Sequence, residues 1–98
     1  MSHIKIKYSI SIIYDDETSQ YVGICGDLDY TGFGDTKEEA ESNTIKAVDM
    51  ALEWARENNQ LEDMLKECGY KMTTINDTQV WQKHYIANYQ EEATVQLV

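Results

Sequence analysis

The first segment of the chain alternates apolar and polar residues with a period of two. Every even position from Ile4 to Tyr14 is large and apolar, whereas the odd positions are lysine or serine as far as Ile13. Because neighbouring side chains of a strand point to opposite faces, this pattern predicts a single β-strand with one buried face. Residues 15–20 are polar and rich in turn formers, so we expect them to lead into a second, short strand at 21–25.

A third strand at residues 28–33 would complete an antiparallel meander, and a helix signal follows it. Thr36 suits the N-cap position, and Glu39 lies three residues later as its partner in a capping box. Apolar and small residues then recur at a spacing of three and four as far as about Glu57, which predicts a helix that covers the sheet. They are Ala40, Thr44, Ala47, Val48, Ala51, Trp54 and Ala55. We expect Trp54 to anchor the core.

A second, shorter helix is predicted after the main one. Asn59 and Glu62 repeat the capping arrangement at its start. Gly69 fits the left-handed position just past its end, where Tyr70 can fold back on Leu65.

The last third of the chain gives weaker signals. Residues 71–79 have no period and many turn formers, so they are predicted to be a loop, and residues 80–89 are compatible with either a strand or a helix. From 85 to 98 the composition becomes typical of a strand, with Ala93, Val95 and Leu97 alternating against polar residues.

These elements predict one α+β domain over residues 1–98. Its small antiparallel sheet would comprise the three-stranded meander and a C-terminal strand, covered on one face by the main helix and the short second helix.

Composition narrows the classes of function. The 98 residues include 18 acidic and 8 basic side chains, for a net charge of −10, which repels nucleic acid and attracts a basic partner. No apolar run is long enough to span a membrane and no signal peptide is recognisable, so we expect a cytoplasmic protein. Cys25 and Cys68 lack the spacing of a metal or redox motif, and we expect both to be reduced and packed.

Residues 27–38 match the sequence expression of a calcium-binding loop. The matching positions are Asp27, Asp29, Thr31, Gly32 and Glu38. The context argues against a metal, because a strand pattern precedes the loop where a helix should stand, and no second loop exists to pair with it. We therefore interpret the stretch as a glycine turn followed by a helix cap, with no metal site.

Other candidates for chemistry are also weak. Gly32 and Gly34 lack the spacing of a phosphate-binding loop, and a role in tight turning is the simpler interpretation. His3 and His84 are the only imidazoles, and a pairing of Cys25 with His84 rests on residue type alone. We predict no catalytic residue, no cofactor and no enzymatic activity.

Residues 21–53, preceded by the long alternating strand, resemble the HicB-like antitoxin domain. The matching positions of its motif are Tyr21, Asp27, Leu28, Gly34, Asp35, Thr36, Glu39 and Ala40. The short helix ending in Gly69 and Tyr70 is similar to a feature of some members. The resemblance implies a partial ribonuclease H-like fold, but the first strand carries none of the carboxylates that hold metal ions in those enzymes.

The resemblance also implies a function. HicB-like domains bind and block a small basic toxin ribonuclease, HicA, and we expect this chain to neutralise such a partner by masking it. Many members also bind operator DNA through a C-terminal module, but this chain ends at Val98, and Gly26 stands where many members have proline, so direct DNA binding is not expected. The alternative is a stand-alone HicB-like structural or regulatory oligomer without a toxin; edge strands of its small sheet would favour a homodimer. The sequence does not indicate the partner-binding surface.

Overall fold

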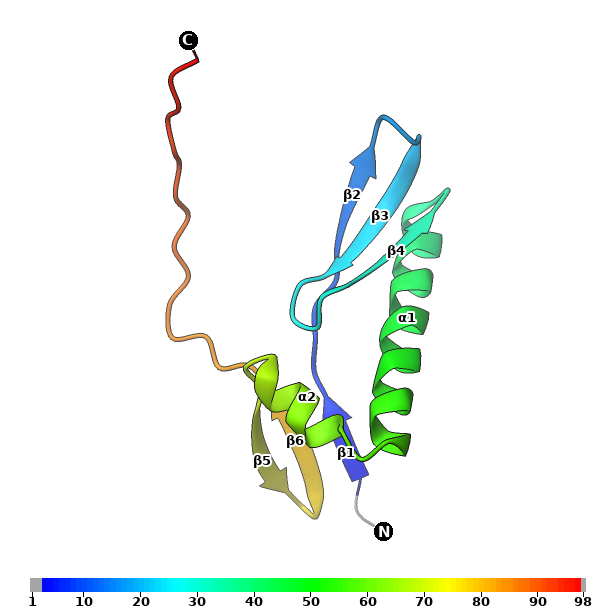
Figure 1. The fold of residues 1–98 in the computed structure, drawn as a ribbon, viewed down its shortest axis with the longest axis vertical. Helices are drawn as coiled ribbons and strands as arrows, with labels where there is room; N and C mark the ends of the chain where they lie inside the picture. The colour runs from blue at the N-terminus through cyan, green and yellow to red at the C-terminus, as the bar shows by residue number, and fades with distance from the viewer. Residues whose placement is uncertain (1–2, 98) are drawn as a thin grey trace.

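The computed structural model describes residues 3–97 and shows an α+β protein (Figure 1). The elements are β1 (His3–Ile6), β2 (Ser11–Asp15), β3 (Gln20–Cys25), β4 (Tyr30–Gly34), α1 (Lys37–Glu57), α2 (Leu61–Glu67), β5 (Lys71–Ile75) and β6 (Thr78–Gln82). Two three-stranded sheets form: the antiparallel meander β2-β3-β4, and a mixed sheet in the order β1-β6-β5. The predicted antiparallel meander is confirmed. The prediction that all strands form a single sheet is wrong.

The predicted first strand is divided between the two sheets. β1 pairs with β6 in parallel, and β2 pairs with β3 in antiparallel orientation. At the break, the Lys7 N–H still donates to the Trp81 carbonyl at 3.0 Å, but the Ser9 N–H donates to a side-chain oxygen of Asp27 at 2.9 Å. The alternation of apolar and polar residues continues through the break, because it depends on the direction of the side chains and not on which strand is the hydrogen-bonding partner.

Helix α1 lies directly on the meander because glycines of the strands leave room for it. Gly23 pairs with Gly32 across β3 and β4. A Cβ at Gly32 would lie 2.8 Å from Thr44 Oγ1 and 2.7 Å from the carbonyl carbon of Asn43, closer than side chains tolerate. The interpretation of Gly32 and Gly34 as turn residues is therefore wrong: both are buried residues of β4 that face α1. The β3–β4 turn instead uses Asp29, whose φ is 65°.

The end of α1 corrects one predicted cap. The helix runs to Glu57 as predicted, but Asn59 has a φ of 57° and follows α1 as its left-handed residue. The next N–H, of Gln60, donates to the Ala55 carbonyl at 2.8 Å, as in a Schellman motif. Gln60 rather than Asn59 precedes α2, and its side chain makes no capping bond.

The end of α2 agrees with prediction. Gly69 has a φ of 89°, and the Tyr70 N–H donates to the Leu65 carbonyl at 2.9 Å. Both Tyr70 and Leu65 are buried in the core cluster. The other buried members of that cluster are Cys25, Leu28, Val48 and Trp81.

Residues 71–79 form most of a β-hairpin, so the predicted loop is wrong. Asn76 and Asp77 have φ values of 48° and 63°, as the two central residues of a type I′ turn require. This turn pairs β5 with β6. Trp81 lies on β6 and is only 4% exposed.

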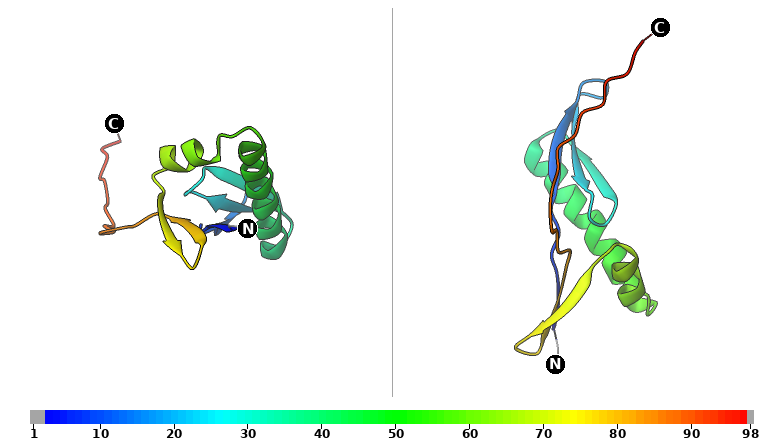
Figure 2. Two further views of the ribbon diagram at one scale, coloured as in Figure 1. Left: turned by 90° about the horizontal axis from the view of Figure 1, so that it is seen from below. Right: turned by 90° about the vertical axis from the view of Figure 1, so that its left-hand side faces the viewer.

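The C-terminal segment, residues 83–97, forms no strand, so the strand predicted from Tyr85 onward is wrong within the described residues; Val98 lies outside them. The segment leaves the body on the side away from α1 (Figures 1 and 2). The radius of gyration is consequently 16.7 Å, where a compact chain of this length would have about 13 Å.

Candidate functional site

The positions that carry the family resemblance lie along one path from β3 through the β3–β4 turn into α1. The Thr36 hydroxyl accepts a 3.0 Å hydrogen bond from the Glu39 N–H, which confirms Thr36 as the N-cap of α1. A Cβ at Gly34 would lie 2.5 Å from the backbone nitrogen of Ala40, so the first turn of α1 rests on the end of β4. Tyr21 packs edge-to-face against Tyr14, with ring centroids 5.0 Å apart. Leu28 is buried in the core and Asp35 is exposed before the helix.

The calcium-loop positions are distributed over three elements. Asp27 and Asp29 lie in the β3–β4 turn, Thr31 and Gly32 are consecutive residues of β4, and the exposed Glu38 is in α1. Within residues 3–97, no three His, Cys, Asp or Glu side chains gather closely enough to hold a metal ion. The residues that match the calcium-loop pattern therefore belong to a turn, a strand and the start of a helix.

Asp27 is the centre of a polar cluster that joins distant segments. Its carboxylate accepts hydrogen bonds from the Ser9 N–H at 2.9 Å and the Tyr85 O–H at 2.8 Å, and Lys83 Nζ lies 3.9 Å from it. We call these four residues the Asp27 junction. The Asp27 side chain is only 15% exposed. With Lys7, Tyr8 and Gln82, the junction lines a hollow of about 150 Å³.

Sequence reasoning identified Asp27 but missed Lys83 and Tyr85. They lie far along the chain from Asp27, in a segment without periodicity, so no spacing rule links them. The junction contains one carboxylate, which is already bonded to its neighbours. It joins the segment that follows β6, the β1–β2 link and the β3–β4 turn.

The structure does not bring Cys25 and His84 together as a nucleophile and base. Burial raises the pKa of the Cys25 thiol, and the nearby charge of Asp27 raises it further, so the thiol stays protonated at neutral pH. Cys25 is a free thiol packed in the core, as predicted, and Cys68 is also free and partly buried. His84 is exposed after β6. The side chain of His3 lies outside the described part of the structure.

The buried phenol of Tyr70 predicts a loss of stability at high pH. Its O–H donates to the Lys7 carbonyl at 2.7 Å, and burial, followed by the charge of Asp27, raises its pKa above the ordinary value. The folded state therefore holds this proton more tightly than the unfolded state does. The stabilisation is complete below about pH 10, where the phenol of the unfolded chain titrates, and is lost as pH rises through the folded pKa.

We expect urea unfolding between about pH 8 and 11 to show this decline, and Tyr70→Phe to reduce it. At neutral pH the substitution should cost about 1 kcal/mol for the lost hydrogen bond. Tyr8 and Tyr85 also have raised pKa values, through burial and through the bond to Asp27 respectively, so some decline should persist. Tyr89→Phe, at an exposed position, is the control. An unchanged pH profile in the Tyr70 variant would contradict the assignment.

The outer side of α1 exposes two large apolar side chains among carboxylates. Met50 is 74% exposed and Trp54 is 56% exposed, and both line a shallow hollow with Asp49, Glu53 and Glu57. We call these five residues the Trp54 surface. The prediction that Trp54 anchors the core is wrong, because α1 turns by about 100° between consecutive residues and it is Ala55 that faces inward.

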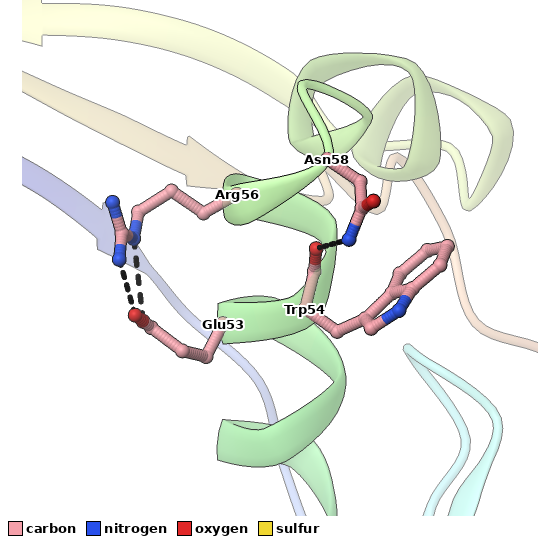
Figure 3. Close-up of polar contacts among 4 residues, drawn as sticks. All are labelled: Glu53, Trp54, Arg56 and Asn58. Atoms are coloured by element: carbon pink, nitrogen blue, oxygen red, sulfur yellow. Dashed lines mark hydrogen bonds and ion pairs between the residues drawn. The ribbon is translucent and has the colours of Figure 1, made fainter.

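Polar contacts hold the last turns of α1 around this surface. Figure 3 shows the Glu53 and Arg56 side chains joined on one side of the helix and the Trp54 indole directed to the other. The hydrogen bond from Arg56 keeps the pKa of Glu53 below its ordinary value, so this carboxylate remains ionised. The Asn58 amide donates to the Trp54 carbonyl at 2.8 Å and caps the helix end. The Trp54 indole is therefore an exposed aromatic group on a helix face that also carries Asp49 and Glu57.

No helix within residues 3–97 is long and apolar enough to cross a bilayer. Comparison with known proteins found no matching family model, no matching curated protein and no matching solved structure.

Proposed function

We propose that this chain is a non-catalytic, HicB-like protein-binding domain that neutralises a small basic HicA-like toxin ribonuclease by masking it. The outline that the resemblance implies is three antiparallel strands, a packed helix and a further strand. In this chain β2, β3 and β4 are antiparallel, α1 packs on them, and β6 lies parallel to β1. The contacts of Gly34 and Thr36 at the start of α1 support the proposal, because both residues belong to the motif that carries the resemblance.

A binding role suits the chemistry of the chain better than a catalytic one. The segment 4–14, which supplies β1 and most of β2, has no carboxylate. Asp15, at the end of β2, accepts bonds from the Glu17 N–H and the Thr18 hydroxyl within its own turn. The Asp27 carboxylate already accepts hydrogen bonds from the Ser9 N–H and the Tyr85 O–H.

The observation that carries the proposal is the Trp54 surface. Tryptophan is among the residues that most often dominate the energy of protein interfaces, and it does so from a central position surrounded by polar groups. Asp49 and Glu57 lie beside it, and the whole chain has a net charge of −10. The negative charge would steer a basic ribonuclease toward this surface, and the ribonuclease would then bind through contacts with Trp54 and Met50.

The test starts from the neighbouring reading frames, where the proposal expects a short basic protein to be encoded. We expect the two purified proteins to form a complex in calorimetry, and this chain to suppress cleavage of RNA by its partner. Trp54→Ala should weaken the complex by about tenfold to a hundredfold, because it removes the central apolar contact. Raising the salt concentration should weaken it further.

Met72→Ala is the matched control, because Met72 is also an exposed apolar residue but lies on β5. It should leave the affinity unchanged. Equal affinities for the wild-type and Trp54→Ala proteins would show that the partner binds elsewhere. Undiminished RNA cleavage in the presence of excess wild-type protein would overturn the proposed function.

A second candidate function is a structural or regulatory oligomer of the same fold without a toxin partner. The observation that favours it is the segment 83–97, whose large apolar side chains are exposed: Tyr85, Ile86, Tyr89, Val95 and Leu97. A genome without a basic neighbour of this kind would favour this candidate.

A further inference from the structure

The segment 83–97, which we call the arm, exposes several large apolar side chains to solvent. All its residues after Lys83 are exposed. The large apolar ones are Tyr85, Ile86, Tyr89, Val95 and Leu97. The two tyrosines alone can bury about 300 to 500 Å², a substantial part of the roughly 800 Å² that each partner contributes to a standard interface.

Strand β2 offers the arm a place to pair. It lies at the edge of the meander, paired with β3 on one side, so its other side presents unpaired backbone groups. In Figure 1 the arm leaves on the side of this edge. On the sheet face opposite α1, Ile13 is 52% exposed and Phe33 is 49% exposed, with Val22 between them in the register.

The arm is kept from the β2 edge of its own chain by the Asp27 junction. Continuing the parallel register of β1 and β6 would place residues 86–90 beside β2. That continuation needs the Ser9 N–H, which lies two residues after the Lys7 N–H that bonds β6. The Ser9 N–H is instead bonded to Asp27, and the Tyr85 O–H is bonded to the same carboxylate. The chain therefore turns away from its own sheet at Tyr85.

We propose that two copies of this chain exchange arms, with residues 93–97 of each copy adding as a strand to the β2 edge of the other. This segment has five residues, the length of β2, and its alternation places Ala93, Val95 and Leu97 on one face. That face continues the exposed apolar patch around Ile13. The eight residue-to-residue steps from Tyr85 to Ala93 can span about 26 Å when extended, enough to reach a neighbouring copy.

Exchange of identical arms is a closed, two-fold arrangement, so it stops at a dimer. It uses the β2 edge and the arm, whereas the Trp54 surface lies on α1. The inference consequently stands whether or not the proposed basic partner exists.

The experiment is light scattering after size exclusion, over protein concentrations from about 1 to 500 µM. We expect wild-type protein to approach twice its mass of 11.3 kDa as the concentration rises. Val95→Asp should raise the dissociation constant at least tenfold, because a carboxylate cannot be buried against Ile13 without a partner. Val95 is 75% exposed, so the circular dichroism spectrum of this variant should not change.

Met72→Asp is the matched control, because it places the same charge on β5, the edge strand of the other sheet. Ile13→Asp should also give a monomer. An equimolar mixture of Ile13→Asp and Val95→Asp should recover dimers, because the intact arm of the first variant can pair with the intact β2 of the second. Higher salt should favour the dimer, since both copies are acidic, whereas it should weaken a complex with a basic protein.

Three results would overturn the inference. They are a wild-type protein that stays monomeric at every concentration, a Val95→Asp protein that dimerises as well as wild type, and a dimer that only Met72→Asp disrupts. Slow hydrogen exchange of the arm amides in a monomer would show that the arm docks on its own chain instead.

Discussion

Gly32→Ala is expected to lower the free energy of unfolding by about 3 kcal/mol, at the upper end of the cost of overpacking. The new methyl group would meet the backbone of α1 at Asn43 and the hydroxyl of Thr44. Thr44 is fully buried and its hydroxyl already donates to the Ala40 carbonyl at 2.7 Å, so neither the helix backbone nor this side chain can move aside without breaking packing. Urea unfolding followed by circular dichroism measures the loss.

Gly26→Ala is the control, because a Cβ at Gly26 meets no atom within 4 Å. Its effect should stay within about 0.5 kcal/mol, as for other surface substitutions. If both variants were equally stable, α1 would not lie as close to β4 as the structure shows.

Trp81→Ala is expected to have the largest effect of any single substitution considered, a loss of about 3 to 5 kcal/mol. Trp81 lies in the core cluster between α2 and the mixed sheet, and its removal would leave a cavity beside Leu65 and Tyr70. Because Trp81 is on β6, and β6 holds both β1 and β5, the cavity would weaken the whole mixed sheet.

Trp54→Ala removes the same side chain from the surface of α1 and is the matched control. It should change stability by less than about 0.5 kcal/mol while weakening the proposed complex. Thermal or urea unfolding by circular dichroism is preferable to fluorescence, since the chain has only these two tryptophans. Similar losses in both variants would contradict the burial assigned to Trp81 and the exposure assigned to Trp54.

The two proposed interactions use different surfaces and respond oppositely to salt. The Trp54 surface is acidic and suits a basic protein, whereas the arm and the β2 edge join two acidic copies through apolar contacts and backbone hydrogen bonds. A dimer could therefore present one Trp54 surface per copy. Measuring both equilibria at two salt concentrations separates them.

Much of the candidate site could not be predicted, because it depends on side-chain direction or on distant partners. The helical period included Trp54, but only the packing of α1 on the meander decided that Ala55 faces inward and Trp54 outward. The contacts of Asp27 with Lys83 and Tyr85 required the fold to bring together two segments that are far apart in the sequence.

The sequence by itself determined the local structures whose physical cause lies within a few residues. Thr36 and Glu39 start α1, Gly69 ends α2, and the polar stretch 15–20 reverses the chain between β2 and β3. A cap or a turn needs only neighbouring backbone groups, so the residues that form it are adjacent in the sequence.

Only the tertiary structure decided which strands pair and where strands stop. The alternating segment 4–14 is divided between two sheets because β6 pairs with its first part and β3 with its last. The end of the arm, residues 93–97, alternates like a strand, but it pairs with no strand among residues 3–97. A strand exists only where another strand completes its hydrogen bonds, and the position of that partner is a property of the whole fold.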